Sequence, residues 1–335
     1  MVPLPELIQA LRNPAAYPSP PQQLEMVQTQ MSVIFFADNY VYKVKKPVNL
    51  GYLDYTTLEK RLLYCRKEVE LNRRLCPDAY LGTVPINSDR GSIRIDGKGR
   101  TIEYAVKMLR LPQGLMLDVM LRNNRVLPSH LTRVAERVAD FHRRAETGSD
   151  ISSLGGLDTV IFNTQENFGQ TEKYFGASIS RKQFEDIKAY TEGFIRDNAS
   201  LFQKRVKDGR IRDCHGDLHA AHVCLTSDIC IYDCIEFNDR FRYCDIASEI
   251  AFLAMDLDHF GRADLSRVFV DAYIEFSRDE EIRELLNFYQ CYRAYVRGKV
   301  NSFKLDDPLI PEAEKKEVMA TARSYFELAE SYIMA

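Results

Sequence analysis

Apolar residues recur with two different periods along this chain, and the change falls near residue 112. Before it, short runs rich in β-branched and aromatic residues are separated by turn residues. Residues 31–37 and 40–46 flank an Ala-Asp-Asn turn, which predicts a β-hairpin. Residues 81–86, 91–95 and 100–109 are also expected to be strands, the last two joined by a hairpin turn at 96–99.

One helix interrupts these strands, and mostly helices follow them. Residues 56–75 carry apolar side chains at helical spacing, and Pro77 is expected to end that helix. After Pro112 the helical period dominates. We expect helices at 131–145, 181–206, 246–255, 263–277, 280–303 and 311–333, with a loop-like stretch at 150–180.

This order predicts an α+β fold with two lobes and a cleft between them. The expected divisions are an N-terminal arm at 1–27, with a short helix at 4–12 and a Pro-rich part at 13–23, then a small β-rich N-lobe at 28–111 and a larger helical C-lobe at 112–335. With 335 residues the chain is long enough for a real core in each lobe.

Composition removes several classes of function. The net charge of -3 gives no electrostatic case for nucleic acid or an anionic membrane as partner. No apolar run is long enough to span a bilayer and no N-terminal signal is apparent, so we expect a cytoplasmic protein without a membrane partner. None of the eight cysteines forms a C-x-x-C pair, and we expect reduced, buried thiols.

The stretch from Cys214 to Val223 carries the strongest chemical signal, because it contains His215-Gly-Asp217-Leu-His219 and is followed by an apolar run with Asp233 and Glu236. Phosphoryl transfer needs a carboxylate that orients the acceptor hydroxyl and another that holds Mg²⁺ on the phosphates. Asp217 is the expected catalytic base, with His215 beside it in the loop.

Two lysines in the second strand of the hairpin are candidates for the ATP phosphates. Lys43 and Lys45 have the same strand parity and therefore face the same side. We take Lys43 first and Lys45 as its alternate, with Glu68 of the following helix as the partner carboxylate. Solvated lysines on an edge strand are the structural alternative. Met108 falls where backbone groups between the lobes would hydrogen-bond adenine.

The pattern is less specific about which residues bind the metal ion. Five residues after Asp217 a kinase usually has Asn, and here that residue is His222, although Mg²⁺ prefers oxygen. Strand parity places Asp233 and Glu236 on opposite faces unless a bulge intervenes, so we expect only one, Asp233 by slight preference, to reach the metal.

Two other functions fit part of this pattern. His215, His219 and His222 have a spacing that zinc accepts, which would make the chain a metal-dependent hydrolase. A kinase-like nucleotide-binding protein with little or no turnover is the other alternative, and His222 is its best argument.

At these residues the chain resembles the aminoglycoside phosphotransferase-like kinases, and in particular a bacterial subgroup known only as aminoglycoside phosphotransferase family enzymes. The H-G-D-L-H loop at 215–219 carries the resemblance, together with YKVKKP at 42–47, GYLDYTTLEK at 51–60, DCHGD at 213–217, DCIEFN at 233–238 and YRAYVRGK at 292–299. It implies a protein-kinase-like fold, ATP and Mg²⁺ (or Mn²⁺), with Asp217 as base and Lys43 paired with Glu68. Some relatives carry a further P-loop domain, but this sequence contains no G-x-x-x-x-G-K-S/T, so none is expected.

The resemblance implies a small-molecule hydroxyl acceptor without naming it. Asp256 and Asp258 would suit a cationic acceptor, whereas Arg293, Arg297 and Lys299 would suit an anionic one. The structural alternative for all five is a charged helix surface. The sequence indicates neither the oligomeric state nor a preference for ATP over GTP.

Overall fold

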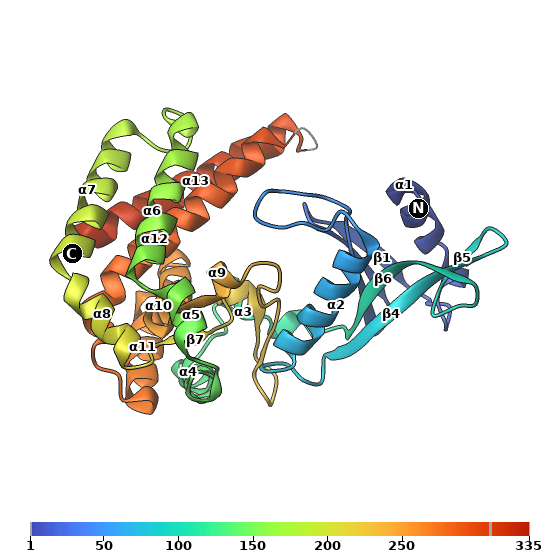
Figure 1. Ribbon diagram of the computed structural model, residues 1–335, viewed down its shortest axis with the longest axis horizontal. Coiled ribbons are helices and arrows are strands. Elements are labelled where there is room, and N and C mark those ends of the chain that lie inside the picture. The colour runs from blue at the N-terminus through green and yellow to red at the C-terminus, as the bar shows by residue number, and fades with distance from the viewer. Residues whose placement is uncertain (1, 308–309, 335) are drawn as a thin grey trace. The chain divides into compact units, whose positions relative to one another are not determined.

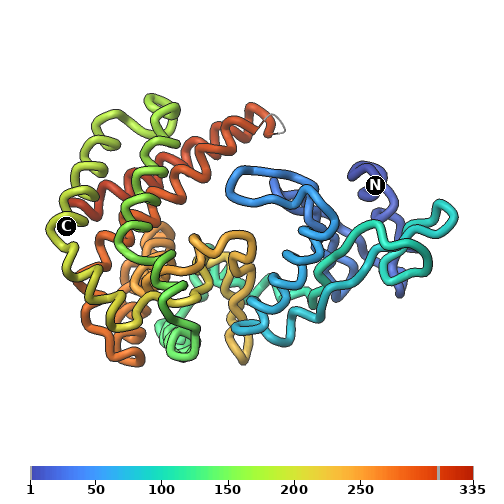
Figure 2. The backbone as a smooth tube through the Cα atoms, in the orientation of Figure 1, coloured from blue at the N-terminus to red at the C-terminus, as the bar shows by residue number. Residues whose placement is uncertain are grey.

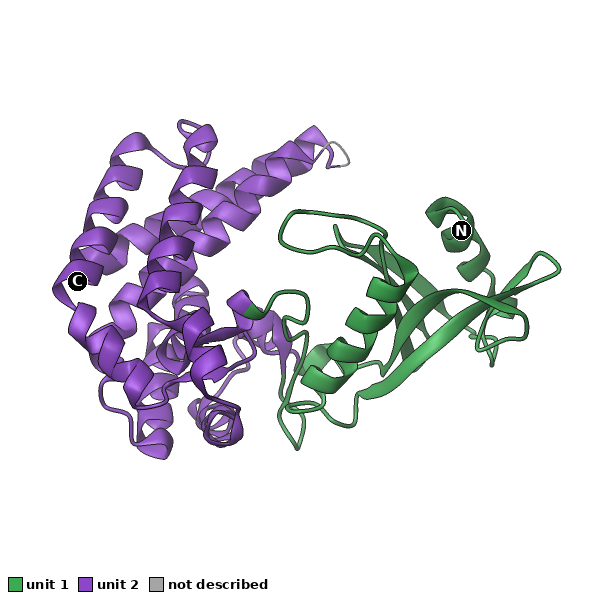
Figure 3. Cartoon of the chain, in the orientation of Figure 1, with its two compact units in different colours: residues 1–115, 224–239 green, residues 116–223, 240–335 purple. Residues whose placement is uncertain are grey.

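The computed structural model describes residues 2–307 and 310–334, and its chain divides into two compact units (Figure 3). Unit 1 contains the residues up to Leu115 together with Cys224–Asp239. Unit 2 contains Met116–Val223 together with the residues from Arg240 onward. The chain therefore leaves unit 1, builds part of unit 2, and returns to unit 1 for one short segment.

Unit 1 is built on an antiparallel sheet of six strands in the order β1-β2-β3-β6-β4-β5 (Figure 1). The strands predicted from the alternating pattern are confirmed, and β1 is added to them. Their bounds are β1 Leu24–Gln28, β2 Ser32–Ala37, β3 Tyr40–Lys45, β4 Tyr80–Asp89, β5 Ser92–Ile95 and β6 Arg100–Leu109.

The pairing of β5 corrects one expected turn. Strand β5 pairs with β4 and not with β6, so residues 96–99 do not close a hairpin between sheet neighbours. The hairpin turn is Arg90-Gly91, where both residues have positive φ, 48° and 84°. Two such residues form the tight turn whose twist matches that of paired strands. Arginine rarely adopts this conformation, so the sequence offered little sign of a turn at Arg90. The glycines at 96–99 therefore suggested the hairpin turn there instead.

The two faces of strand β3 meet different surroundings. Tyr42 and Val44 point into an apolar core that also contains Leu7 and Leu11 of helix α1 (Leu4–Leu11). Lys43 and Lys45 alternate with them and lie on the other face, beside helix α2 (Leu58–Asn72). Strand periodicity thus places both lysines on the side where α2 packs on β6 and β4.

Helix α2 begins where the sequence indicated and ends sooner. Thr57 accepts a hydrogen bond from the Lys60 amide and caps the helix. The helix ends at Asn72, so Pro77 lies beyond its end and does not terminate it. The guanidinium of Arg61 is buried against Glu103 of β6, with Nη2 at 2.8 Å from Oε2, and this ion pair joins α2 to the sheet.

A disulfide joins Cys224–Asp239, which we call the return segment, to the chain just after helix α2. Cys76, shortly after α2, is bonded to Cys230 of β9 (Cys230–Ile231), and their Cα atoms are 4.6 Å apart. The expectation that the cysteines are reduced is therefore wrong for this pair. Its spacing of 154 residues carries no C-x-x-C signal, so pattern reading had no means to detect it. The remaining six cysteines are free thiols.

Unit 2 is mainly helical. The helices expected beyond residue 246 are confirmed within a few residues. The stretch at 150–180 is not a loop, because it holds α5 and α6, and the helix expected at 181–206 is divided at Asn198 into α7 and α8. The bounds are α3 Leu117–Arg122, α4 Pro128–Arg144, α5 Ser149–Gly155, α6 Leu157–Thr171, α7 Arg181–Asp197, α8 Ala199–Lys207, α10 Ile246–His259, α11 Ala263–Ser277, α12 Ile282–Phe303 and α13 Glu312–Ile333.

Short elements complete the described chain. Strands β7 (Ile211–Asp213) and β10 (Tyr243–Asp245) form an antiparallel pair, while β8 (Val223–Cys224) and α9 (Asp239–Arg242) lie at the boundaries between the units. The 3₁₀ turns are Pro14–Ala16, Gln113–Leu115, Glu172–Tyr174, Ala220–His222 and Lys304–Asp306.

Two glycines allow close packing between elements of unit 2. Helices α12 and α13 run side by side (Figure 2), and a Cβ added at Gly298 of α12 would lie 2.9 Å from the ring of Phe326 on α13. A Cβ at Gly155 would lie 2.3 Å from Ile211 of β7, so only glycine lets α5 approach that strand. Across residues 2–307 and 310–334, no helix is both long and apolar enough to cross a membrane.

Candidate active site

The lysine pair of unit 1 surrounds one buried carboxylate. Glu68 is fully buried, with Lys43 Nζ 2.9 Å from its Oε1 and Lys45 Nζ 2.6 Å from its Oε2. The Lys43 contact is an ion pair without hydrogen-bond alignment, which leaves Oε1 without a hydrogen bond in the structure. Glu68 is therefore not a solvated helix charge, and the lysines do not form a protective surface on an edge strand.

The return segment supplies two further carboxylates to this cluster. Lys43 Nζ donates to Asp233 at 2.7 Å, and Lys45 Nζ donates to Glu236. The hydroxyl of Tyr55 donates to the same Glu236 oxygen at 2.6 Å. The side chain of Asp233 remains 41% exposed, while that of Glu236 is 6% exposed, so Asp233 is the acid that a ligand can reach.

Both acids face the lysines, which corrects the expectation that they lie on opposite faces. Strand β9 ends at Ile231, so strand parity no longer applies at residues 233 and 236. Asp233 has φ 63°, in the left-handed region, and this turns the chain. Its amide donates to the Tyr80 hydroxyl at 3.2 Å, and the next amide, of Cys234, donates to Asn72 at 2.9 Å.

The cluster stays charged at neutral pH. Burial favours the neutral form of Lys43, but Asp233 and Glu68 outweigh burial and raise its pKa well above the ordinary value. The pKa of Glu68 is lowered, because Lys43 and Lys45 together outweigh the effect of burial. Two ammonium groups thus face three carboxylates, and the excess of negative charge suits a divalent cation that reaches the exposed Asp233.

The loop with the H-G-D-L-H sequence lies in unit 2, directly after β7. Gly216 has φ 87°, which only glycine adopts at little cost, and the turn brings Asp217 out of the buried part of the loop. The side chain of Asp217 is 31% exposed, whereas His215 is 1% exposed. His215 accepts a hydrogen bond from the Asp217 amide on Nδ1 at 3.3 Å, so His215 orients the loop.

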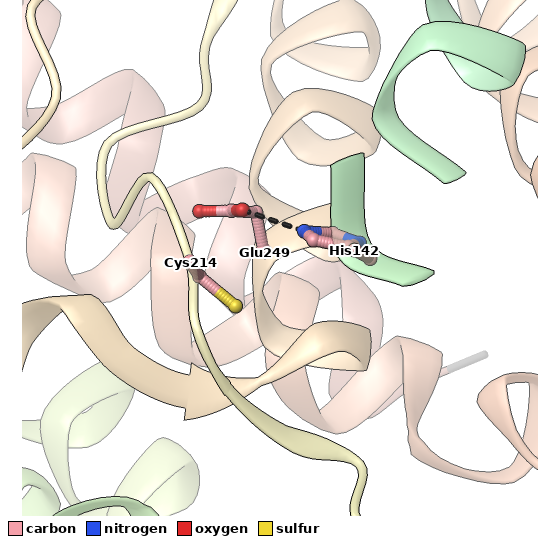
Figure 4. A group of neighbouring side chains, drawn as sticks. All are labelled: His142, Cys214 and Glu249. Carbon is pink, nitrogen blue, oxygen red and sulfur yellow. Dashed lines mark hydrogen bonds and ion pairs between the residues drawn. The ribbon is translucent and has the colours of Figure 1, made fainter. Parts of the chain in front are cut away.

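A buried carboxylate holds this loop from behind. Glu249 of α10 accepts from the amides of His215, at 2.9 Å, and Gly216, at 2.6 Å. His142 of α4 contacts the same carboxylate through Nε2 at 2.7 Å and the Tyr273 hydroxyl through Nδ1 at 2.7 Å. Figure 4 shows His142 pointing at Glu249, with Cys214 beside them. We call His142, Glu249 and Tyr273 the loop clamp.

Burial and hydrogen bonding act in opposite directions on the clamp. Burial raises the pKa of Glu249, but His142, then His215, outweigh burial and lower it to about 2 from the ordinary value of 4.5. The clamp therefore works with an ionised carboxylate. Because Glu249 already accepts two amides and contacts an imidazole, hydrogen bonds account for the approach of His142 without any metal ion, while the Cys214 thiol donates to the Cys244 carbonyl.

Replacing Glu249 by glutamine is expected to lower the free energy of unfolding and to remove part of its pH dependence. A folded-state pKa below the unfolded one stabilises the protein above pH 4.5, and that stabilisation is lost as the pH falls towards about 2. The carboxylate contributes on the order of 3 kcal/mol by this linkage. Urea unfolding at pH 7 and pH 3 measures it, with the exposed Glu284→Gln as control. Equal losses in both variants would contradict the role of the clamp.

His219 and His222 lie next to Asp217 rather than forming a triad with His215. His219 Nε2 is 3.6 Å and His222 Nδ1 is 3.5 Å from Oδ2 of Asp217. His222 Nδ1 also lies 2.9 Å from the Asp217 carbonyl oxygen. The rings of His219 and His222 are 4.0 Å apart, whereas His215 and His222 are 6.2 Å apart. The grouping that the structure brings together is therefore Asp217, His219 and His222.

The charge environment favours an ionised Asp217. Burial alone would raise the pKa of Asp217, but the neighbouring His219, followed by His222, outweighs burial. Arg297 adds to this effect, and together they hold the pKa of Asp217 far below its ordinary range. The carboxylate is thus an anionic hydrogen-bond acceptor throughout the neutral pH range.

Four of the five charged residues considered for the acceptor are structural. Their side chains are engaged by other residues of unit 2 and do not form a charged helix surface. Arg293 donates to Ser248 and, through Nη1 at 3.3 Å, to the Gly216 carbonyl. Lys299 donates to Asn167 at 2.6 Å, and burial lowers the pKa of Lys299 to about 8.

The two acids of this set are similarly engaged. Asp256 accepts from the Ala220 amide at 2.8 Å and so supports the end of the loop that carries Asp217. Asp258 accepts from Gln290 at 2.9 Å and Tyr332 at 2.6 Å, and burial raises the pKa of Asp258. Only Arg297, through its interaction with Asp217, remains a candidate for contact with an acceptor.

Met108 lies near the end of β6, paired with Val41 and Tyr80, and its side chain is buried. Sequence reading missed Tyr55 and the loop clamp. The G-Y-L-D-Y segment carried Tyr55 as part of the resemblance, but His142 had no signal beyond an apolar helix face. Its contact with Glu249, 107 residues later, depends on the packing of α4 on α11, which in turn packs on α10.

The chain has relatives by sequence among the curated proteins. No protein-family model matches the chain. Uncharacterized proteins of Mycobacterium tuberculosis and Mycobacterium bovis are each 33% identical over 278 residues, which is 83% of this chain and 54% of theirs. The chain thus spans about half the length of the curated relatives it matches.

Solved structures show the fold. A Ralstonia eutropha protein assigned to the aminoglycoside phosphotransferases aligns over 93% of this chain and 92% of its own, with 11% identity and a TM-score of 0.51. A Plasmodium vivax ethanolamine kinase aligns over 93% of this chain and 81% of its own, with 12% identity and a TM-score of 0.49. At this identity the first match speaks for fold alone. The chain therefore shares the fold of this aminoglycoside phosphotransferase-like protein.

Proposed function

We propose that this protein transfers the γ-phosphate of ATP to a hydroxyl group of a small molecule. The observation that carries the proposal is the cluster of Lys43, Glu68 and Asp233 in unit 1. It holds an ammonium group for phosphate beside an accessible carboxylate for a metal ion. The Asp217 loop of unit 2 adds the anionic acceptor that a reacting hydroxyl needs.

Lys43 is the residue proposed to bind the phosphates, since it is more accessible than Lys45. Glu68 orients it. Lys45, which is 1% exposed and engaged with Glu68 and Glu236, serves mainly to neutralise those carboxylates. Met108 is proposed to lie beside the adenine, at the end of the sheet.

Asp233 is the proposed ligand for Mg²⁺ (or Mn²⁺), and Glu236 is the alternative. An oxygen ligand that is reachable and charged fits both ions. When bound, the ion would neutralise charge on the phosphates. His222 stands where kinases of this type have asparagine, and it is proposed as a metal-binding residue of the Asp217 loop. We propose a cytoplasmic location.

Asp217 is proposed to accept a hydrogen bond from the acceptor hydroxyl and to orient its oxygen for attack. The low pKa of Asp217 makes it a weak base, so orientation is its main contribution. His215 and the loop clamp act as positioning residues, because they contact the loop backbone and hold it in shape.

Calorimetric titration of ATP tests the nucleotide site. Binding to the wild-type protein is expected to depend on Mg²⁺ or Mn²⁺, to be lost in Asp233→Asn, and to persist with reduced stability of the protein in Glu236→Gln. The exposed Asp228→Asn, on the same return segment, is the matched control. Loss of ATP binding in Glu236→Gln alone would show that Glu236, and not Asp233, is the metal ligand. Absence of binding with either ion would contradict the proposal.

A kinase-like protein that binds nucleotide without turnover is the second candidate, and the observation that favours it is His222. Screening hydroxyl compounds for ATP consumption separates the two. Release of ADP that requires an acceptor supports phosphotransfer. Metal-dependent binding without consumption across sugars, amino alcohols and aminoglycosides supports the binding protein.

A further inference from the structure

We propose that Asp217, His219 and His222 form a binding site for a divalent transition-metal ion of the Zn²⁺ class, and that an ion bound there inhibits the protein. We call these residues the loop triad. The site would take two imidazole nitrogens and one carboxylate oxygen as ligands. Its inhibitory effect rests on the proposed function, because it removes Asp217 from the acceptor hydroxyl.

The spacing of the loop triad fits one small ion. Ligand atoms of a tetrahedral zinc site, each about 2.0–2.1 Å from the ion, lie about 3.3 Å from one another. The Asp217 oxygen is 3.6 Å from His219 Nε2 and 3.5 Å from His222 Nδ1. The three ligand atoms that these residues offer all lie within 4.8 Å of one another. Small side-chain shifts would therefore complete the coordination.

The donor set selects the type of ion. Two imidazoles and one carboxylate suit Zn²⁺, Co²⁺ and similar ions, whereas Mg²⁺ requires mainly oxygen ligands. An asparagine at position 222, the usual kinase residue, would present only a neutral oxygen. His222 thus changes the metal preference of this corner of the catalytic loop.

The surroundings hold the ligands in place. The His219 side chain is 7% exposed and packs against Phe252 of α10, with ring centres 5.6 Å apart. His222 Nδ1 lies 2.9 Å from the Asp217 carbonyl oxygen, which can only accept a hydrogen bond. An ion that binds Nδ1 would displace the proton of this hydrogen bond, and the imidazole would carry its proton on Nε2. Asp217, at 31% exposure, leaves a path from solvent.

The nearby Arg297 favours inhibition over a role in catalysis. Its positive charge already interacts with Asp217 and Asp256, so a cation bound by Asp217 shares the charge of that carboxylate with Arg297. With Asp217 coordinated, neither of its functions is available: it cannot accept a hydrogen bond from a hydroxyl, and its charge is neutralised. The ion would therefore compete with the acceptor.

Titration with metal alone tests the site without ATP or acceptor. The full chain is stripped with EDTA, exchanged into a non-chelating buffer and titrated with ZnCl₂ by calorimetry and with CoCl₂ by visible absorption. We expect one equivalent of Zn²⁺ and a tetrahedral Co²⁺ spectrum. His219→Asn, His222→Asn and Asp217→Asn should each weaken binding more than tenfold. His130→Ala, a histidine outside the triad, and Cys244→Ser, a half-buried thiol, should not change it.

Circular dichroism confirms that each variant is folded. No stoichiometric zinc in the wild-type protein, or equal affinity in the triad variants and the controls, would overturn the site. In an assay of acceptor-dependent ADP release with millimolar Mg²⁺ present, half-maximal inhibition should occur at the Zn²⁺ concentration that half-fills the site. Full activity with the site filled would overturn the inhibitory role. If the protein binds zinc but shows no phosphotransfer, the metal site is supported. The inhibitory role and the proposed function would then both be contradicted.

Discussion

Replacing Asp217 by asparagine is expected to lower phosphotransfer by about 10²-fold, the loss that misplacing a reacting group can cause. The amide keeps the shape of the side chain but loses its charge, and one of its two terminal groups can only donate a hydrogen bond. Because Lys43, Glu68 and Asp233 are unchanged, calorimetric binding of ATP with Mg²⁺ should remain within about threefold of the wild type.

The measurement is the initial rate of acceptor-dependent ADP release, with thermal unfolding recorded on the same samples. The control is Asp186→Asn, which removes a carboxylate from an exposed ion pair with Lys182 on α7. Such a pair is worth about 0.5 kcal/mol or less, so the control should keep full activity. Turnover by Asp217→Asn at the rate of the control would contradict the assignment of the loop.

Replacing Lys45 by methionine is expected to destabilise the protein by about 3–5 kcal/mol, the usual cost of removing one partner from a buried ion pair. Lys45 is 1% exposed, and its loss would leave Glu236 beside Tyr55 without an ammonium group. Glu68 would keep only Lys43. Methionine has a side chain of similar length, so the lost stability reports the missing charge rather than missing packing.

Urea unfolding of Lys45→Met, Lys43→Met and Lys60→Met separates the roles. Lys43→Met should cost less stability, because Asp233 is accessible to water and Glu68 retains Lys45, yet it should abolish ATP binding. Lys60 pairs with Asp54 at the surface, so Lys60→Met should have little effect on stability or on ATP binding. If Lys45→Met is as stable as the wild type while losing ATP, the phosphate lysine is Lys45.

The sequence predicts most of the fold because local patterns determine it. Alternation defined β2, β3 and β6, and helical spacing defined α4, α11 and α12. The failures occur where tertiary contacts decide. The stretch at 150–180 lacks a strong apolar face, yet α5 and α6 form because they pack on β7, β10 and α12. The β4–β5 turn was missed because Arg90 takes a glycine-like conformation.

The candidate site shows the same division. The sequence showed that Lys43 and Lys45 face the same side, and it offered Glu68 as the helix carboxylate beside them. The joint approach of Asp233 and Glu236 was not, since it depends on the end of β9, on Asn72 and on Tyr80. The residues of the loop clamp come from three helices, and no local pattern connects them.

The return of the chain to unit 1 has a consequence for synthesis on the ribosome. Lys43 and Lys45 emerge with Glu68 as partner, but Asp233 and Glu236 follow 190 and 191 residues later. At roughly 5–20 residues per second, the interval from Met116 to Asp239 lasts on the order of ten seconds. During it the early strands carry two lysines for one carboxylate and an unpaired Cys76. The nascent N-terminal unit is thus incomplete until much of unit 2 has been made, which exposes it to chaperones for that time.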